Sequence, residues 1–301
     1  MMMMTVRLLA SFHFILVRRI LIVLFYRSAR GNNMYTVSIP MLVVLIVDVL
    51  VSLAIPIGLY VVLRRRFGCA RTPFFLGAAT FFLFAMVLEQ LVHLVVLRSS
   101  IGAAIQQNIW LFALYGGAMA ALFEEGGRLI VFSTLLKKRR DNDYDALMFG
   151  AGHGGMEVIL IFTITMVMNL YYALMIRSGR ADALLASMEE GQRATTALIF
   201  TSLSTASAPF YLLGLVERFA AVILHLSFSV LVWFALKGKF SLLYLAVLLH
   251  FAVDAITVVL SRSGLSPLLL EVLVVLFSLL CALIARWAWK AQSRTTASDT
   301  Q

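Results

Sequence analysis

The amino-acid sequence predicts an all-α, polytopic membrane protein in which about seven transmembrane helices form one bundle. Hydrophobic residues make up 62% of the 301 residues, charged residues make up 13%, and the mean hydropathy is +0.96. A soluble fold cannot bury so many apolar side chains, so the long apolar runs are expected to lie in lipid. These runs lack the alternation of apolar and polar residues that marks the strands of a membrane β-barrel, which leaves helices.

Seven apolar runs are each long enough to cross a bilayer as a helix. Their predicted bounds are 38–63, 73–97, 106–136, 144–172, 209–236, 240–260 and 267–289. Most connections between them are short, but residues 173–208 form a longer segment rich in Ala, Ser and Thr, which is predicted to carry a surface helix. The chain is therefore divided into an N-terminal extension (1–33), a helical bundle (34–292) and a disordered tail (293–301).

The N-terminal extension fits this plan poorly. Its apolar stretch, residues 8–26, has Arg18 and Arg19 at the middle, where charge inside a membrane is costly. Three explanations stay open: a signal peptide, an extra helix that lies in the membrane interface, or translation that begins at Met34. We favour the last.

Basic residues gather at alternate ends of the predicted spans. One set of connections, together with the C-terminal end, carries 13 Lys and Arg, and the opposite set carries 5. Cytoplasmic loops are enriched in Lys and Arg, so the first set and the C-terminus are predicted to be cytoplasmic in a bacterial-type inner (plasma) membrane. The net charge of +10 is thus explained by basic residues that anchor the chain to the lipid bilayer. No nucleic-acid partner is expected.

Ionisable side chains inside four of the spans are the strongest functional signal, because such groups are expensive in lipid and usually serve a function. They are Glu124, Glu125 and Arg128; His153 and Glu157; Glu217, Arg218 and His225; and His250 and Asp254. Counted from the nearest cytoplasmic charge, Glu124 and the three histidines all lie roughly 16–20 Å into the membrane at 1.5 Å per residue. One layer of the bundle is therefore predicted to hold a carboxylate and three imidazoles.

The spacing along each helix groups these residues further. Arg128 follows Glu124 by four residues and Glu125 by three, so one guanidinium can reach both carboxylates. His153 and Glu157 are four residues apart and so share a helix face.

The same spacing recurs on two other spans. His250 and Asp254 are four residues apart, and a carboxylate at that position can orient an imidazole. Arg218 lies on the same face as His225, with Glu217 beside it. His93 and Glu89, nearer an outer end, are predicted to form a local pair.

Glycine-rich stretches on two spans predict close helix packing. Gly150, Gly152, Gly154 and Gly155 resemble a nucleotide-binding loop, but no strand precedes them and they lie inside an apolar helix. On the third span, small residues at 116, 117, 120 and 121 are interpreted in the same way, and we expect that approach to bring Glu124 and the fourth span together.

The chemistry that suits this layer is metal-assisted hydrolysis. His153, His225 and His250 can bind Zn²⁺ and leave a fourth position for water, whose pKa the metal lowers. A nearby glutamate can then take the proton from that water. Such a site fits hydrolysis of a peptide bond, and equally of a lipid amide or ester.

Three motifs resemble those of the CAAX prenyl endopeptidase/bacteriocin-processing superfamily of intramembrane proteases. They are Glu-Glu-x-x-Arg at 124–128, Phe-x-x-x-His at 149–153 and His-x-x-x-Asp at 250–254. The run Gly-Ala-Gly-His-Gly-Gly-Met-Glu at 150–157, with Glu-Arg at 217–218 and His225 on an added span, most resembles the YhfC family of intramembrane metalloproteases. The resemblance covers about residues 36–290. It implies cleavage of a membrane-protein or peptide substrate within or beside the membrane.

The resemblance also implies roles for individual residues. Glu124 would activate the water, with Glu125 and Arg128 supporting it. His153 would join the water site, and His250 with Asp254 would be ligands or would stabilise the oxyanion. The third motif often ends in Asn, and the Asp at 254 favours support of a metal ligand. His225 supplies the third imidazole for Zn²⁺, while Glu157, Glu217 and Arg218 would lie behind the ligands or contact the substrate.

Two other functions stay open from the sequence. A seven-span zinc-dependent lipid amide or ester hydrolase would use similar donors, although a ceramidase-like enzyme normally has a second His where Asp254 stands. A transporter or non-catalytic scaffold would use the same charges as a relay, and helices broken at the midplane would favour it. The sequence specifies neither the substrate nor the oligomeric state.

Overall fold

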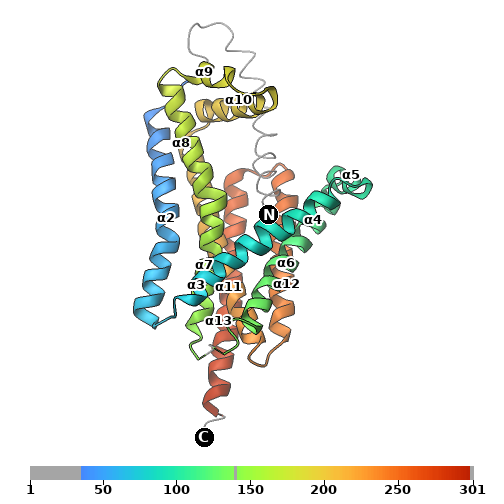
Figure 1. Ribbon diagram of the computed structural model, residues 1–301. Coiled ribbons are helices and arrows are strands. Elements are labelled where there is room, and N and C mark those ends of the chain that lie inside the picture. Colours follow the sequence, from blue (N-terminus) through green and yellow to red (C-terminus); the bar gives the residue numbers. More distant parts are fainter. Residues whose placement is uncertain (1–34, 139–140, 299–301) are drawn as a thin grey trace.

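The computed structural model describes residues 35–138 and 141–298, and all regular secondary structure in that part of the chain is helical. The elements are α2 (Ile39–Phe67), α3 (Thr72–Thr80), η1 (Phe81–Leu88), α4 (Glu89–Val96), α5 (Ser100–Gln107), α6 (Ile109–Ser133), α7 (Tyr144–Glu157), η2 (Val158–Thr163), α8 (Ile164–Arg177), α9 (Ala181–Ala186), α10 (Glu190–Thr205), α11 (Ala208–Ala235), α12 (Ser241–Arg262) and α13 (Pro267–Ser298). Figure 1 shows the long helices side by side in one bundle, with α9 and α10 across the upper ends of α2 and α8. The predicted all-α fold is confirmed.

Two predicted regions fall wholly or partly beyond this description. The N-terminal extension, residues 1–33, lies outside the described residues. The predicted tail at 293–301 is described as far as residue 298, where α13 ends.

Six helical stretches are long and apolar enough to cross a membrane. They are Ile39–Phe67, Thr72–Val96, Tyr144–Arg177, Ala208–Ala235, Ser241–Arg262 and Pro267–Gln292, and each matches one predicted span. The remaining predicted span corresponds to α6, which is 25 residues long. It contains Glu124, Glu125 and Arg128, so its composition is less apolar than that of the other six. The charges that make α6 functionally interesting are therefore also what separates it from an ordinary spanning helix.

Two of the spanning stretches change to π-helix partway along. The π segment η1 lies between α3 and α4, and η2 lies between α7 and α8. Single π turns are often found near functional sites, because they shift the faces on which the following side chains lie. The segment η2 begins directly after Glu157, and η1 packs against α6, where a Cβ on Gly127 would lie only 2.8 Å from Cγ of Phe84. Both π segments therefore adjoin the helices that carry the candidate site.

Glycines on α7 allow three other helices to approach it closely. A Cβ on Gly152 would lie 1.8 Å from the carbonyl oxygen of Phe74 on α3, and one on Gly155 would lie 2.6 Å from Cβ of Pro56 on α2. A Cβ on Gly150 would lie 2.9 Å from the carbonyl oxygen of residue 225 on α11. Helix packing is therefore the role of this glycine-rich run, as the sequence predicts.

The small residues of α6 contact a different helix from the one expected. A Cβ on Gly117 would lie 2.7 Å from the carbonyl oxygen of Phe251, so this face of α6 packs against α12. The prediction that these small residues pack α6 against α7 is wrong, because the helix that they contact is α12. The predicted contact of Glu124 with His153 is nevertheless present, with 3.0 Å between Oε2 and Nε2.

The clusters of basic residues lie at one end of the bundle. Figure 1 places the α2–α3 turn, the α6–α7 loop, the α11–α12 turn and the C-terminal end of α13 at the lower end. These connections carry the basic residues of the first set, including Arg64, Lys137 and Lys237. The helices therefore alternate as the charge pattern requires, and the assignment of this end to the cytoplasm stays a prediction.

Candidate metal centre

Three helices bring Glu124, His153 and His225 together in the buried interior. Each offers a ligand atom that lies within 4.8 Å of the other two. Nε2 of His153 is 3.0 Å from Oε2 of Glu124, and Nδ1 of His225 is 3.8 Å from the same oxygen. The two imidazole ring centroids are 4.9 Å apart. The layer predicted from counting residues thus contains a compact group of one carboxylate and two imidazoles.

The local sequence explains how His225 reaches this position. Gly154 on α7 faces the ring of His225, and a Cβ there would lie 3.0 Å from Cδ2 and 3.2 Å from Cβ of that histidine. A larger residue at 154 would displace the imidazole. Gly154 follows His153 directly, so the same turn of α7 supplies one imidazole and the space for the other.

Arg128 links the two glutamates of α6 to the histidine of α11. Its guanidinium donates a hydrogen bond to Glu125 and another to Nδ1 of His225, the second at 2.6 Å between the nitrogens. Nη2 also lies 3.7 Å from Oε2 of Glu124. The expectation that one guanidinium reaches both carboxylates is confirmed. All four side chains are buried, so this arginine compensates charge inside the bundle.

Glu157 pairs with a different histidine from the one its spacing suggests. It shares a helix face with His153, but Nε2 of His225 donates to it across the α7–α11 contact. Arg218, seven residues earlier on α11 than His225, donates to the other oxygen of Glu157 at 2.6 Å and to Glu217. Glu157 therefore holds His225 in place and is itself held by Arg218.

His250 lies at the edge of this group. Its Nδ1 is 2.6 Å from Oε1 of Glu125, and its Nε2 is 3.6 Å from Oδ2 of Asp254. The ring stacks on Phe228 at 5.0 Å between centroids and lies 6.4 Å from the ring of His225. Its imidazole thus contacts the second glutamate of α6, while the other two histidines surround the first.

The donor set of Glu124, His153 and His225 fits a divalent metal ion. Imidazole nitrogen and carboxylate oxygen are ligands that zinc accepts, and metal-bound histidines usually donate their other ring N–H to a carboxylate. Glu157 supplies that carboxylate to His225. Oε1 of Glu124 is buried and has no hydrogen-bond partner among the described residues, so it has capacity for a further contact.

Aromatic side chains cover the centre on the side of the α6–α7 loop. Phe149 lies one turn below His153 on α7, and its ring is 4.5 Å from that of Phe132. Phe132 in turn packs edge-on against Trp233 at 5.2 Å, and all three rings are fully buried. The centre is therefore closed by packed rings toward the end of the bundle that carries the basic turns.

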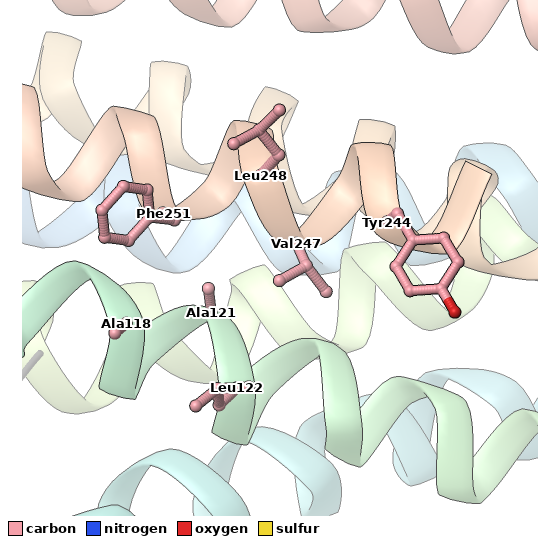
Figure 2. A pocket seen from close by; sticks show the side chains of 7 residues that line it. All are labelled: Ala118, Ala121, Leu122, Tyr244, Val247, Leu248 and Phe251. Carbon is pink, nitrogen blue, oxygen red and sulfur yellow. The ribbon is translucent and has the colours of Figure 1, made fainter. Parts of the chain in front are cut away.

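An apolar pocket with a volume of about 270 Å³ lies between α6 and α12 (Figure 2). It is lined by Ala118, Ala121, Leu122, Tyr244, Val247, Leu248 and Phe251. No carboxylate or imidazole lines it, so it offers no metal ligands. Leu122, Tyr244 and Leu248 are largely exposed, as expected for a surface that faces lipid.

The sequence analysis did not single out the buried Glu271 or the half-buried Tyr115. Glu271 on α13 interacts electrostatically with Glu217 and Arg218. Glu271 is the lone acidic residue of the predicted span 267–289, which could have identified it as a candidate site residue. It was missed because no ionisable residue lies at helical spacing from it. Tyr115 joins the predicted pair of His93 and Glu89, which is confirmed at 3.1 Å, through a hydroxyl 2.8 Å from Nδ1 of the histidine.

Thiol chemistry is disfavoured in the turn that joins the first two spans. Cys69 is fully buried there, and burial raises the pKa of its thiol to about 11, with the nearby Asp145 carboxylate acting in the same direction. A neutral buried thiol is a poor nucleophile. Cys69 is therefore not expected to act as a nucleophile.

Comparison with known proteins agrees with the motifs and this geometry. The model of the family described as YhfC intramembrane metalloprotease matches residues 51–275, a range that contains every candidate site residue from Glu124 to Asp254. The chain is also 35% identical over 246 residues to "Uncharacterized membrane protein YhfC" of Bacillus subtilis (strain 168), an alignment that covers 80% of this chain and 93% of that protein. No solved structure matches the chain.

Proposed function

We propose that this chain, which belongs to the YhfC intramembrane metalloprotease family, is a zinc-dependent endopeptidase. It would cleave a membrane-associated protein or peptide. The observation that carries the proposal is the buried contact of Glu124 with His153 and His225. A carboxylate beside two imidazoles is suited to activating water. Placing them within the bundle suits a peptide bond that lies in or beside the membrane.

His153 and His225 are the residues that would hold the metal, and Glu157 would orient His225. The third imidazole expected from the sequence, His250, lies outside the group of ligand atoms that are within 4.8 Å of one another, so we assign it to the substrate side of the site. A bound Zn²⁺ polarises a carbonyl group and lowers the pKa of its water to about 7.

Glu124 is the proposed general base. Its Oε1 has no partner among the described residues, so it can accept the proton of a water molecule as the water oxygen attacks the carbonyl carbon of the substrate. The same proton then passes to the amide nitrogen as the carbon–nitrogen bond breaks, which leaves an acid and an amine. Arg128, 3.7 Å away, balances the negative charge of Glu124 in the resting site.

His250 is the proposed donor to the carbonyl oxygen of the substrate. Its Nδ1 is fixed by Glu125, and its Nε2 lies toward Asp254. A donor held in place before the reaction stabilises the negative charge that develops on that oxygen, and one such donor typically contributes about 10²–10³ in rate. Asp254 is 3.6 Å from Nε2, beyond hydrogen-bond distance, so this nitrogen is left to donate to the carbonyl oxygen.

The decisive experiment compares Glu124→Gln with Glu125→Gln in purified protein. Removing a general base typically costs about 10²–10⁴ in rate, so Glu124→Gln should lose turnover of a peptide substrate, and Glu125→Gln should keep measurable activity. Zinc content, measured by mass spectrometry of the metal, should stay near one per chain in Glu124→Gln. In His225→Ala zinc retention should fall about 10-fold or more, as for a lost ligand, and His250→Ala should keep its zinc.

Two outcomes would change the assignment. Loss of zinc in Glu124→Gln would make Glu124 a metal ligand and move the base elsewhere. Turnover of Glu124→Gln at the rate of the unmodified protein would show that proteolysis by this route is wrong. Glu190→Gln, an exposed change on α10, is the matched control and should behave like the unmodified protein.

A further inference from the structure

A chain of hydrogen-bonded side chains leads from the metal centre to a more exposed region of the bundle. The side chain of Glu124 is 0% exposed and that of His225 is 5% exposed. Beyond them come Glu157 at 4%, Arg218 at 7% and Glu217 at 36%. Each of the last three is joined to its neighbour by a hydrogen bond or ion pair, so this chain is a polar connection between the centre and the surroundings.

This connection runs away from the aromatic side chains that close the other side. Arg218 precedes His225 by seven residues on α11, which places it roughly 10 Å nearer the start of that helix. The start of α11 is at the end of the bundle opposite the basic turns, where α10 lies in Figure 1. The polar approach to the centre is thus from the end that the charge pattern predicts to be external.

Two carboxylates contact the guanidinium of Arg218, and a third interacts electrostatically with it. Glu157 and Glu217 both accept from Arg218, and Glu271 interacts electrostatically with Glu217 and Arg218. Glu271 is only 6% exposed, and its Oε2 has no hydrogen-bond partner in the part of the chain that the structure describes. A buried carboxyl oxygen without a partner is costly, so Oε2 of Glu271 has capacity for a donor supplied from outside the chain.

We propose that Glu217, Arg218 and Glu271 form a subsite, here called the acidic subsite, that binds a Lys or Arg side chain of the substrate. This inference rests on the proposed function. Arg218 lies seven residues nearer the start of α11 than His225, toward the end of the bundle that the charge pattern predicts to be external. The basic residue of the substrate would therefore lie to the external side of the bond that is cleaved.

A basic side chain fits this subsite better than a second metal ion does. Arg218 already donates to one oxygen of Glu157 and one of Glu217, which leaves few free carboxylate oxygens to surround a metal ion. A Lys ammonium carries a single charge and three N–H donors, so it can donate to the unpartnered oxygen of Glu271 without having to be surrounded by ligands.

The test measures binding separately from cleavage. The protein is the full chain with Glu124→Gln, in detergent and loaded with zinc. The probes are two fluorescent single-span peptides of about 20 apolar residues that differ only in having Lys or Gln at one position of the external half. A charge-assisted hydrogen bond contributes about 1.5–3 kcal/mol, so the Lys peptide should bind roughly 10-fold more tightly or better.

The preference for Lys should depend on the acidic subsite. Adding Glu271→Gln should bring the two dissociation constants to within about 3-fold of each other, since the charge-assisted bond is then lost. Adding Glu190→Gln, the matched exposed change, should leave the preference intact. Where Glu271→Gln does not give folded protein, Glu217→Gln tests the same subsite.

The outcomes separate this inference from the proposed function. Equal binding of the Lys and Gln peptides to the Glu124→Gln protein would overturn the acidic subsite. If that protein binds a second metal ion and the Glu271→Gln change removes it, the region is a metal site and the inference is also overturned. Preferred binding of the Lys peptide without any cleavage by the unmodified protein would support the subsite and contradict the protease. When the unmodified protein cleaves a series with Lys at successive positions, the cut should move with the Lys at a constant spacing.

Discussion

Replacing Arg128 with Met tests how the buried charges of the centre are balanced. Arg128 is fully buried, donates to Glu125 and His225, and lies 3.7 Å from Glu124. Removing one partner of a buried ion pair typically costs about 3–5 kcal/mol, because the other charge is left uncompensated. We expect Arg128→Met to lower the free energy of unfolding by about that amount. This corresponds to roughly 10²- to 10⁴-fold more unfolded protein.

The measurement is unfolding in detergent, followed by circular dichroism, for single and double variants. Glu125→Gln combined with Arg128→Met removes both charges of the closest pair, so the double variant should recover a large part of the loss. Arg286→Met, an exposed change at the far end of α13, should stay within about 0.5 kcal/mol of the unmodified protein. Stability of Arg128→Met equal to that of the unmodified protein would refute the reasoning, since the carboxylates would then need no counter-charge.

Two further predictions concern packing and topology. Gly152→Ala should lower the melting temperature strongly, because the added Cβ would lie 1.8 Å from a backbone oxygen of Phe74. Gly126→Ala, the control, adds its Cβ in open space and should be tolerated or stabilising. Equal melting temperatures of the two variants would contradict the close contact of α3 and α7. Reporter fusions after residue 140 and at the C-terminus should both report the cytoplasm, since these ends carry the basic turns, and an external signal from either would invert the topology.

The depth of the site could be predicted from the sequence because helix geometry is nearly constant. Each residue adds 1.5 Å, and the basic turns mark one end of every span, so residues can be placed in a layer by counting. Glu124, His153 and His225 do lie within 4.8 Å of one another. The contact of Arg128 with both glutamates was also predictable, because it is local to one helix.

The contacts between helices could not be predicted in this way. Glu157 has the spacing to support His153, yet it accepts a hydrogen bond from His225 on another helix. The spacing of two residues on one helix says nothing about how that helix is rotated against its neighbours. The π segment η2, which begins after Glu157, makes prediction harder still. It changes the rotation of the residues of α8 that follow it, and it has no clear signature in the sequence.

The glycines of α7 and the ionisable residues of the centre depend on each other. Without side chains at 150, 152 and 155, the backbones of α11, α3 and α2 come so close to α7 that a Cβ would collide with their atoms. That proximity lets Glu157 reach His225 and leaves room for its ring beside Gly154. It also leaves few gaps for lipid or water, so unpaired charges there would be costly and the hydrogen bonds between them count for more. A motif that looks like a nucleotide-binding loop thus serves here to bring buried acids and imidazoles into contact.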